Sequence, residues 1–208
     1  MMPALFSFTP EASGFRTEAV SVGVAIILIA VYALSLLFSF KTHKALFRGA
    51  THTEEPKWSL RRAIGVLAGA TVLVALMSEF LVDALEDTTK ELGLSKLFVG
   101  LIVVPIVGNA AEHSSAIFLA AKNKMDVSVE IAVGSSTQIA LFVAPMLVFV
   151  SLLVGRPVDL IFSGIEIAAV AFSAVILGFI TLDARSNWIE GAQLVAAYLI
   201  MAVSFFFL

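Results

Sequence analysis

Six apolar segments dominate the sequence, and each is about as long as one membrane span. They cover residues 20–40, 63–80, 97–121, 128–154, 160–182 and 188–208. A helix of about 20 apolar residues crosses the hydrocarbon core of a bilayer. The chain is 60% hydrophobic, whereas about half of an ordinary soluble domain is apolar. We therefore predict an all-α fold, a polytopic bundle of six transmembrane helices embedded in a lipid bilayer.

Charge and cysteine content exclude several classes of function. The formal net charge is −3, so the chain offers no basic surface for nucleic acid, and we predict no nucleic-acid partner. The chain has no cysteine, which excludes disulfides, thiolate metal sites and cysteine nucleophiles. Its first residues lack the basic region and cleavage site of a secretory signal peptide, so we expect no cleaved leader.

Lysine and arginine are distributed unevenly between the segments, which predicts an orientation in the membrane. Residues 41–62 form the most basic loop, and we place this loop in the cytoplasm, with both termini on the opposite side. A chain that starts outside without a leader is expected to be part of something longer. We divide the chain into residues 1–62, a leading transmembrane helix with the basic loop, and residues 63–208, a five-helix membrane domain.

The third apolar segment carries polar residues at its middle. Between residues 97 and 121, Glu112 and His113 are the only ionisable residues. A charged group at the bilayer centre costs about 2.5 to 3.5 kcal/mol on insertion scales, so such a residue indicates a functional site. Asn109, Glu112 and His113 stand at positions i, i+3 and i+4 and therefore share one helix face. Pro105, just before them, favours a kink or break in the helix.

The fourth segment carries a second polar patch at a similar depth. Residues 122–127 alone separate it from the third, so the two helices must form an antiparallel hairpin. Ser135 and Gln138 share a helix face at i and i+3. At about 1.5 Å per residue, Glu112 and Gln138 both lie roughly 15 to 20 Å from the hairpin tip. We therefore expect the two patches to meet near the middle of the membrane.

Other polar residues of the spans have plainer interpretations. Ser136 is expected to hydrogen-bond the backbone or a neighbouring helix, as membrane serines commonly do. Glu79 lies near the last turn of its segment, where a charge reaches the lipid headgroups. We keep both as second-rank site candidates. Glu166 and Glu190 lie near the starts of their segments, where the helix dipole favours a negative charge.

The two polar patches together have the chemistry of an ion-binding site. A carboxylate with amide and hydroxyl oxygens at one depth is part of an oxygen cage for a hard cation such as Ca²⁺, which takes about 6 to 8 oxygens. The predicted metal ligands are Glu112, Asn109 and Gln138. A carboxylate there also binds a proton, and the proton and the cation exclude each other. Exchange follows if the site faces each side of the membrane alternately.

Alternatives from other classes are a cation channel subunit and a non-transporting membrane scaffold. In the scaffold, Glu112 and His113 only pair with groups on neighbouring helices and stabilise the bundle. A zinc hydrolase does not fit, because no second histidine stands four residues from His113, as the H-E-x-x-H signature requires. We predict a secondary active transporter and no enzyme, without a cofactor.

Three stretches in this region closely resemble the second α-repeat of the calcium/proton exchangers in the cation/calcium exchanger superfamily. They are GNAAEH at 108–113, KNKMD at 122–126 and IAVGSSTQIALFVAP at 131–145. A looser resemblance extends over the whole chain. The resemblance implies a fold with one leading helix and two five-helix halves of inverted topology, each of which brings one motif glutamate to a midplane site.

Under this resemblance, the six spans correspond to the last helix of the first half and the whole second half, so the chain is the C-terminal half of a calcium/proton antiporter. Ca²⁺ is the transported substrate, and H⁺ or, alternatively, Na⁺ is the coupling ion. Glu112 is the cation- and proton-binding carboxylate, and His113 adjoins and tunes it. Asn109, Ser135 and Gln138 help to form the cage. Because the sequence holds one such motif, the expected partner is an N-terminal half with the first repeat, from the same gene product or a separate chain. The implied location is a prokaryotic cell membrane or, in a eukaryote, a vacuolar-type membrane.

Overall fold

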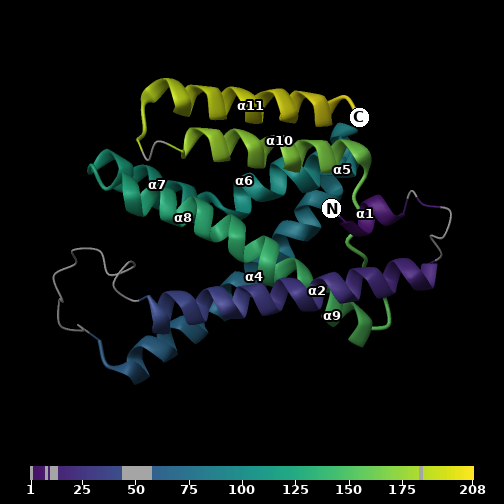
Figure 1. Cartoon of the computed structure of the whole chain (residues 1–208), viewed down its shortest axis with the longest axis horizontal. Helices are drawn as coiled ribbons and strands as arrows, with labels where there is room; N and C mark the ends of the chain where they lie inside the picture. Colours follow the sequence, from purple (N-terminus) through teal and green to yellow (C-terminus); the bar gives the residue numbers. More distant parts are fainter. Residues whose placement is uncertain (1, 8, 10–13, 44–57, 183–184) are drawn as a thin grey trace. The chain divides into compact units, whose positions relative to one another are not determined.

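The computed structural model describes residues 2–7, 9, 14–43, 58–182 and 185–208, and over these residues it consists of helices without a strand (Figure 1). The predicted all-α fold class is thereby confirmed. The helices are α1 (Met2–Phe6), α2 (Gly14–Leu37), α4 (Leu60–Leu92), α5 (Lys96–Phe98), α6 (Val104–Gly108), α7 (Ala110–Ala121), α8 (Met125–Gln138), α9 (Ala144–Leu153), α10 (Gly164–Ile180) and α11 (Trp188–Phe206). Three π-helical segments adjoin them, η1 (Phe38–Thr42), η2 (Val99–Val103) and η3 (Ile139–Val143). Most of the predicted basic loop, residues 44–57, lies outside the described residues.

Each predicted apolar segment corresponds to helical structure, although the number of full spans differs from six. Four helices are long and apolar enough to cross a bilayer, namely Arg16–Thr42, Leu60–Leu92, Met125–Leu153 and Trp188–Phe206. The third segment is the bent pair Lys96–Gly108 and Ala110–Ala121, which passes the same test as one span. The fifth forms α10, an apolar helix of 17 residues, about 26 Å long at 1.5 Å per residue. The described residues therefore give four or five spans by length and composition, and α10 is a shorter apolar helix.

The chain divides into two compact units. The hairpin unit comprises Met1–Phe47 and Ala110–Ala197, and the α4 unit comprises Arg48–Asn109 and Tyr198–Leu208. The leading helix α2 and the hairpin of α7 and α8 thus belong to the same unit. The division at residue 62 predicted from the sequence concerns the order of membrane elements along the chain, and it stays a prediction.

A tight turn joins α7 to α8, and the two helices lie side by side (Figure 1). The Lys124 N–H donates to the Leu119 carbonyl (2.9 Å) and the Asn123 N–H to the Ala120 carbonyl (2.9 Å), the two bonds of a Schellman motif. Asn123 has φ = 58°, a left-handed conformation that asparagine adopts more readily than most residues. The predicted antiparallel hairpin is confirmed, and its turn follows from this asparagine.

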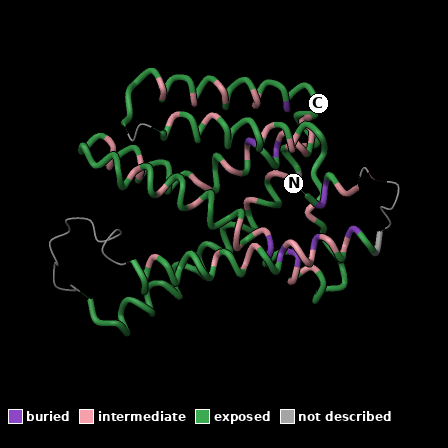
Figure 2. The backbone as a smooth tube through the Cα atoms, in the orientation of Figure 1, coloured by how far each residue is buried: buried purple, intermediate pink, exposed green. Residues whose placement is uncertain are grey.

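Helix α2 packs along η3 and α9 in the hairpin unit. Its buried residues Thr17, Ser21 and Ala25 are small and recur every four positions, which lets a neighbouring helix approach closely. In Figure 2, stretches coloured as buried lie along the first half of α2. On the other side of the contact, Pro145 and Val148 of α9 are buried. The α2 stripe therefore forms much of the described core of this unit.

The segment between α9 and α10 is fixed by two serine side chains. The Leu160 N–H donates to Ser21 Oγ of α2 (3.2 Å), and the Val158 N–H donates to Ser151 Oγ of α9 (2.9 Å). Ser21 is 1% exposed, so its hydroxyl is available only to such an internal partner. These bonds satisfy backbone donors that no helix would otherwise satisfy.

Most large apolar side chains in the described spans are exposed, as the largely green trace of Figure 2 shows. In α4, for example, the exposed apolar residues include Leu67, Leu73 and Phe80. An exposed apolar surface of this extent is expected for helices that face lipid or a further protein segment. The observed exposure therefore agrees with the predicted location in a bilayer.

The two π-helical segments η2 and η3 each end two residues before a proline. At the end of η2 the Val104 N–H donates to the Val99 carbonyl, and at the end of η3 the Ala144 N–H donates to the Ile139 carbonyl. Proline removes a backbone donor and clashes with the carbonyl four residues earlier. A locally wider helix accommodates that clash. The kink predicted near Pro105 therefore takes the form of η2, followed by a break at Asn109.

Candidate ion-binding site

The hairpin brings together two of the predicted site residues, Glu112 and Ser135. Ser135 Oγ donates a hydrogen bond to Glu112 Oε2 at 2.5 Å. Glu112 lies in the first turn of α7, where the helix dipole attracts a negative charge. A second bond, from Ser128 Oγ to the Ala116 carbonyl (2.8 Å), ties the same helices nearer the turn. Together the two bonds fix the register of α7 against α8.

The depth of this pair agrees with the spacing argument. Glu112 lies nine residues before Ala121, the end of α7, and Ser135 lies ten residues after Met125, the start of α8. At 1.5 Å per residue, both residues are about 15 Å from the turn, which is half the thickness of a typical hydrocarbon core of about 30 Å. At this distance from the turn, a carboxylate near the start of α7 therefore meets a hydroxyl near the end of α8.

The structure does not bring Gln138 into hydrogen-bonding contact with Glu112. Gln138 ends α8, one turn beyond Ser135, and its side chain is exposed. Within the described part of the chain, this side chain makes no hydrogen bond. Its place in an oxygen cage stays a prediction. Ser136 behaves as predicted, because its hydroxyl donates to the Ala132 carbonyl of its own helix (2.9 Å).

Asn109 and His113 lie close in sequence to Glu112 but make no side-chain hydrogen bond to any described residue. Asn109 occupies the break between α6 and α7, with φ = −95° and ψ = 9°, and it belongs to the α4 unit. Its N–H donates to the Pro105 carbonyl (2.9 Å). His113 is exposed on α7. The predicted roles of both side chains stay predictions.

The remaining acidic candidates differ in their surroundings. Glu79 is exposed on α4, and its rank as a site residue stays a prediction. Glu166 Oε2 accepts a bond from the Ser163 N–H (2.7 Å), completing a capping box at the start of α10. Glu190 Oε2 likewise accepts from the Asn187 N–H (3.1 Å) before α11. The predicted helix-start roles of these two glutamates are confirmed.

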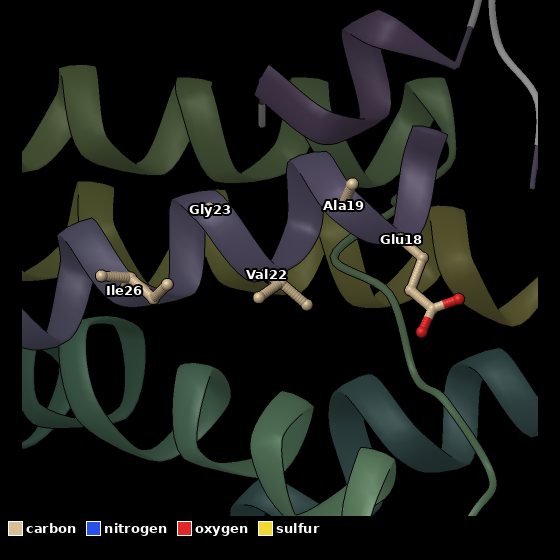
Figure 3. Close-up of a pocket in the computed structure, with 5 residues that line it drawn as sticks. All are labelled: Glu18, Ala19, Val22, Gly23 and Ile26. Carbon is tan, nitrogen blue, oxygen red and sulfur yellow. The ribbon is translucent and has the colours of Figure 1, made fainter. Parts of the chain in front are cut away.

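Among the described residues, the structure contains no group of three or more histidine, aspartate or glutamate side chains that could hold a metal ion. An open depression of about 360 Å³ lies beside α2 and is lined by Glu18, Ala19, Val22, Gly23 and Ile26. Figure 3 shows Glu18, Val22 and Ile26 along one side of the helix. These residues were not predicted as site residues. Glu18 is the single carboxylate in this lining, and the other four lining residues offer no side-chain oxygen for a cation.

Sequence reasoning missed the contacts that α2 makes with η3 and with the segment between α9 and α10. The Tyr32 ring stacks on Phe142 of η3, with ring centroids 5.2 Å apart, and Ser21 holds the backbone at Leu160. The small residues at positions 17, 21 and 25 are a signal that could have indicated close packing of α2. The aromatic pair carried no comparable signal, because its two residues lie 110 positions apart in the sequence.

The fold and the site define a polytopic membrane protein in which a carboxylate accepts a hydrogen bond from a hydroxyl within an apolar hairpin. A family model described as sodium/calcium exchanger protein matches residues 62–207. The chain belongs to this family of membrane proteins. The predicted membership of the cation/calcium exchangers is thereby confirmed, as is the multi-pass membrane location.

Related proteins of known name are similar over most of this chain. The chain is 42% identical over 224 residues to a Ca²⁺/H⁺ antiporter of Aphanothece halophytica, covering 100% of this chain and 60% of that protein. It is 47% identical over 193 residues to the Ca²⁺/H⁺ antiporter ChaA of Bacillus subtilis, covering 90% of this chain and 55% of that protein. The solved structure of native YfkE matches with a TM-score of 0.80 at 42% identity, covering 100% of this chain and 58% of that one. This chain therefore spans somewhat more than half the length of these relatives.

Proposed function

We propose that this chain acts as the second half of a calcium/proton antiporter, with Glu112 as the carboxylate that binds Ca²⁺ and H⁺ in turn. The observation that carries the proposal is the hydrogen bond between Glu112 and Ser135 within an apolar hairpin. Similarity to proteins named Ca²⁺/H⁺ antiporters supports the choice of ions. It also supports a transporter in preference to an enzyme.

Coupling follows from the chemistry of one carboxylate in an apolar setting. Away from water, an unpaired negative charge is costly, so the carboxylate favours a bound cation or a bound proton. Ca²⁺ needs the ionised form, and protonation removes the charge that holds the metal. Because the two ligands exclude each other, a site that opens alternately to the two sides exchanges Ca²⁺ for H⁺. In the proposed direction, Ca²⁺ enters from the cytoplasm and protons from the far side release it.

The proposed ligand side chains of this chain offer too few oxygens for a complete Ca²⁺ cage. Glu112 offers two oxygens and Ser135 one, and the proposed ligands Gln138 and Asn109 add one carbonyl oxygen each. Ca²⁺ takes about 6 to 8 oxygens, so water or another polypeptide segment must supply the rest. We propose that an N-terminal half, with a first repeat and its own carboxylate, completes the cage. The chain covers 60% and 55% of the length of two named antiporters, which supports this proposal.

The supporting residues have distinct proposed roles. Ser135 orients the Glu112 carboxylate and contributes its own oxygen when the metal is bound. Gln138 presents an amide oxygen one turn away on the same face. His113, next to Glu112, tunes the charge around the carboxylate.

The test of this proposal is the substitution Glu112→Gln in the assembled exchanger. Glutamine keeps the size and a carbonyl oxygen but cannot ionise, so Ca²⁺-dependent proton flux in membrane vesicles is expected to vanish while expression stays normal. Glu166→Gln is the matched control, because glutamine also serves in a capping box. That control is expected to transport normally.

The same assay separates the alternatives. Near-normal flux in Glu112→Gln would remove this residue from the mechanism. Ca²⁺ movement as current without proton counterflow would indicate a channel. Counterflow that requires Na⁺ would change the coupling ion. If the wild-type assembly moves no ions at all, the result would favour the non-transporting membrane scaffold.

A further inference from the structure

The π-helical segment η3 begins directly after Gln138, the last residue of α8. The geometry of η3 therefore determines the direction in which Ser135 and Gln138 point around the helix axis relative to α9. The Ala144 N–H donates to the carbonyl of Ile139, five residues earlier, and Pro145 follows at once. Such a segment carries one residue more per turn than a regular helix needs. A slip back to the regular register would move α8 relative to α9 by about 1.5 Å and about 100°. Something must therefore hold η3 in its present register.

Helix α2 contacts this segment directly. The Tyr32 ring stacks on Phe142, near the end of η3, with centroids 5.2 Å apart and an interplanar angle of 29°. Both residues are partly buried. Tyr32 lies seven residues beyond Ala25 and so continues the packing stripe of α2 to its far end. Nearer the start of α2, Ser21 of the stripe accepts a hydrogen bond from the Leu160 N–H.

The stack also lies close to the site along α8 and η3. Phe142 is four residues beyond Gln138 and seven beyond Ser135, about one and two helical turns. Ser135 in turn donates to Glu112. A fixed ring at Phe142 therefore limits rotation of the segment on which Ser135 and Gln138 are carried.

We propose that Tyr32 is a positioning residue for the Glu112 site. By stacking on Phe142, it holds the register of η3 and so keeps Ser135 at hydrogen-bonding distance from Glu112. The assignment of this site to ion binding rests on the proposed function, but the effect of Tyr32 on the hairpin can be measured without transport.

The test uses the absence of native cysteines, which allows spin labels to be placed on chosen pairs in the full chain in lipid nanodiscs. The first pair, Ala111→Cys with Ser136→Cys, reports on α7 and α8 at the depth of the site. The second pair, Ile117→Cys with Val129→Cys, reports on the same helices nearer the turn. All four positions are exposed. Distance distributions from pulsed electron spin resonance are compared with and without substitutions at Tyr32.

Tyr32→Ala is expected to broaden the distribution of the first pair, or to add a second distance, while the second pair is unchanged. Tyr32→Leu, which keeps apolar bulk without a ring, is expected to act like Tyr32→Ala. It replaces the alanine variant in the test if that variant does not reach the membrane. Tyr32→Phe keeps the ring and is expected to restore the wild-type distribution. Tyr198→Ala, at a tyrosine in the α4 unit, is the matched control and should have no effect.

Three results would overturn the positioning role. They are a wild-type distribution for the first pair in both Tyr32→Ala and Tyr32→Leu, equal broadening of both pairs, or the same change in Tyr198→Ala. In the assembled exchanger, Tyr32→Ala should raise KM for Ca²⁺ more than it lowers kcat, with recovery in Tyr32→Phe. If Glu112→Gln leaves transport intact, the proposed function fails, while the spin-label distances still decide the role of Tyr32.

Discussion

At the scale of single residues, two neighbouring serines show how position on a helix decides what a hydroxyl does. Ser135 Oγ donates across the hairpin to Glu112, whereas Ser136 Oγ donates to the Ala132 carbonyl of its own helix. Both hydroxyls are satisfied, but the Ser135 hydroxyl alone has an ionisable partner. The pair therefore allows a comparison of one hydroxyl at the site with one beside it.

We predict that Ser135→Ala weakens the apparent Ca²⁺ affinity of the assembled exchanger by about tenfold. The alanine removes one proposed ligand oxygen and the bond that orients the Glu112 carboxylate, and a loss of about 1.4 kcal/mol corresponds to a tenfold change. The measurement is the Ca²⁺ dependence of proton flux in vesicles. Ser136→Ala is the control and should change this affinity by less than about twofold. Equal effects of the two substitutions would contradict a specific role for Ser135.

The residues of the candidate site differ in how far the sequence alone could predict them. An acidic residue within an apolar run makes Glu112 a site candidate without any structure, because a charge at the bilayer centre is costly. Ser135 was predicted because it shares a helix face with Gln138, which lies at about the same distance from the hairpin tip as Glu112. The expected meeting of Gln138 with Glu112 is not observed as a hydrogen bond, because equal depth does not fix the direction in which a side chain points around the helix axis. Tyr32 could not be predicted, since its importance depends on a partner in a distant segment.

At the scale of elements, the turn between α7 and α8 depends on one residue in the left-handed region. Asn123 has φ = 58° and donates its N–H to the Ala120 carbonyl. A residue with a branched Cβ is strained there, whereas glycine is not.

We predict that Asn123→Val lowers the stability of the hairpin by about 1 to 2 kcal/mol, whereas Asn123→Gly is nearly neutral. The measurement is the midpoint of thermal unfolding in detergent, followed by the loss of helical circular dichroism. A cysteine-free chain allows this comparison without oxidative aggregation through thiols. An equal loss in both variants would show that the asparagine side chain, and not its backbone conformation, stabilises the turn.

The elements also show what apolar periodicity and length can predict. Apolar length correctly located the helical segments, and the short connection at 122–127 predicted the hairpin. Glu166 and Glu190 were recognised as helix-start charges from their positions, and the capping bonds agree. The π-helical form of η2 and η3 was not predictable, because a proline indicates a disturbed helix without specifying how the chain accommodates it.

At the scale of the whole molecule, the proposal that the chain works with a further polypeptide segment has two supports. The proposed ligands of this chain supply fewer oxygens than Ca²⁺ takes. The chain also covers 60% of the Aphanothece antiporter and 55% of ChaA. The large exposed apolar surface is compatible with both lipid and a second half.

We predict that this chain alone, reconstituted in vesicles, shows no Ca²⁺-driven proton flux. Co-reconstitution with the part of the Bacillus subtilis antiporter that this chain does not cover should restore flux, because the missing carboxylate and oxygens are then present. The control is the same N-terminal part with the Glu112→Gln chain, which should stay inactive. Robust exchange by this chain alone would contradict the need for a second half.

The bond from the Leu160 N–H to Ser21 has a practical consequence for dividing such proteins. Anyone who splits a longer relative into two co-expressed pieces would naturally cut after the leading helix, in the basic stretch equivalent to residues 44–57. That cut would put Ser21 on one piece and its partner, the Leu160 N–H, on the other. The two pieces would then have to associate by diffusion in the bilayer before this bond could form. A cut before α2 keeps Ser21 and Leu160 on one polypeptide. Helix α2 should therefore be expressed together with the repeat that follows it.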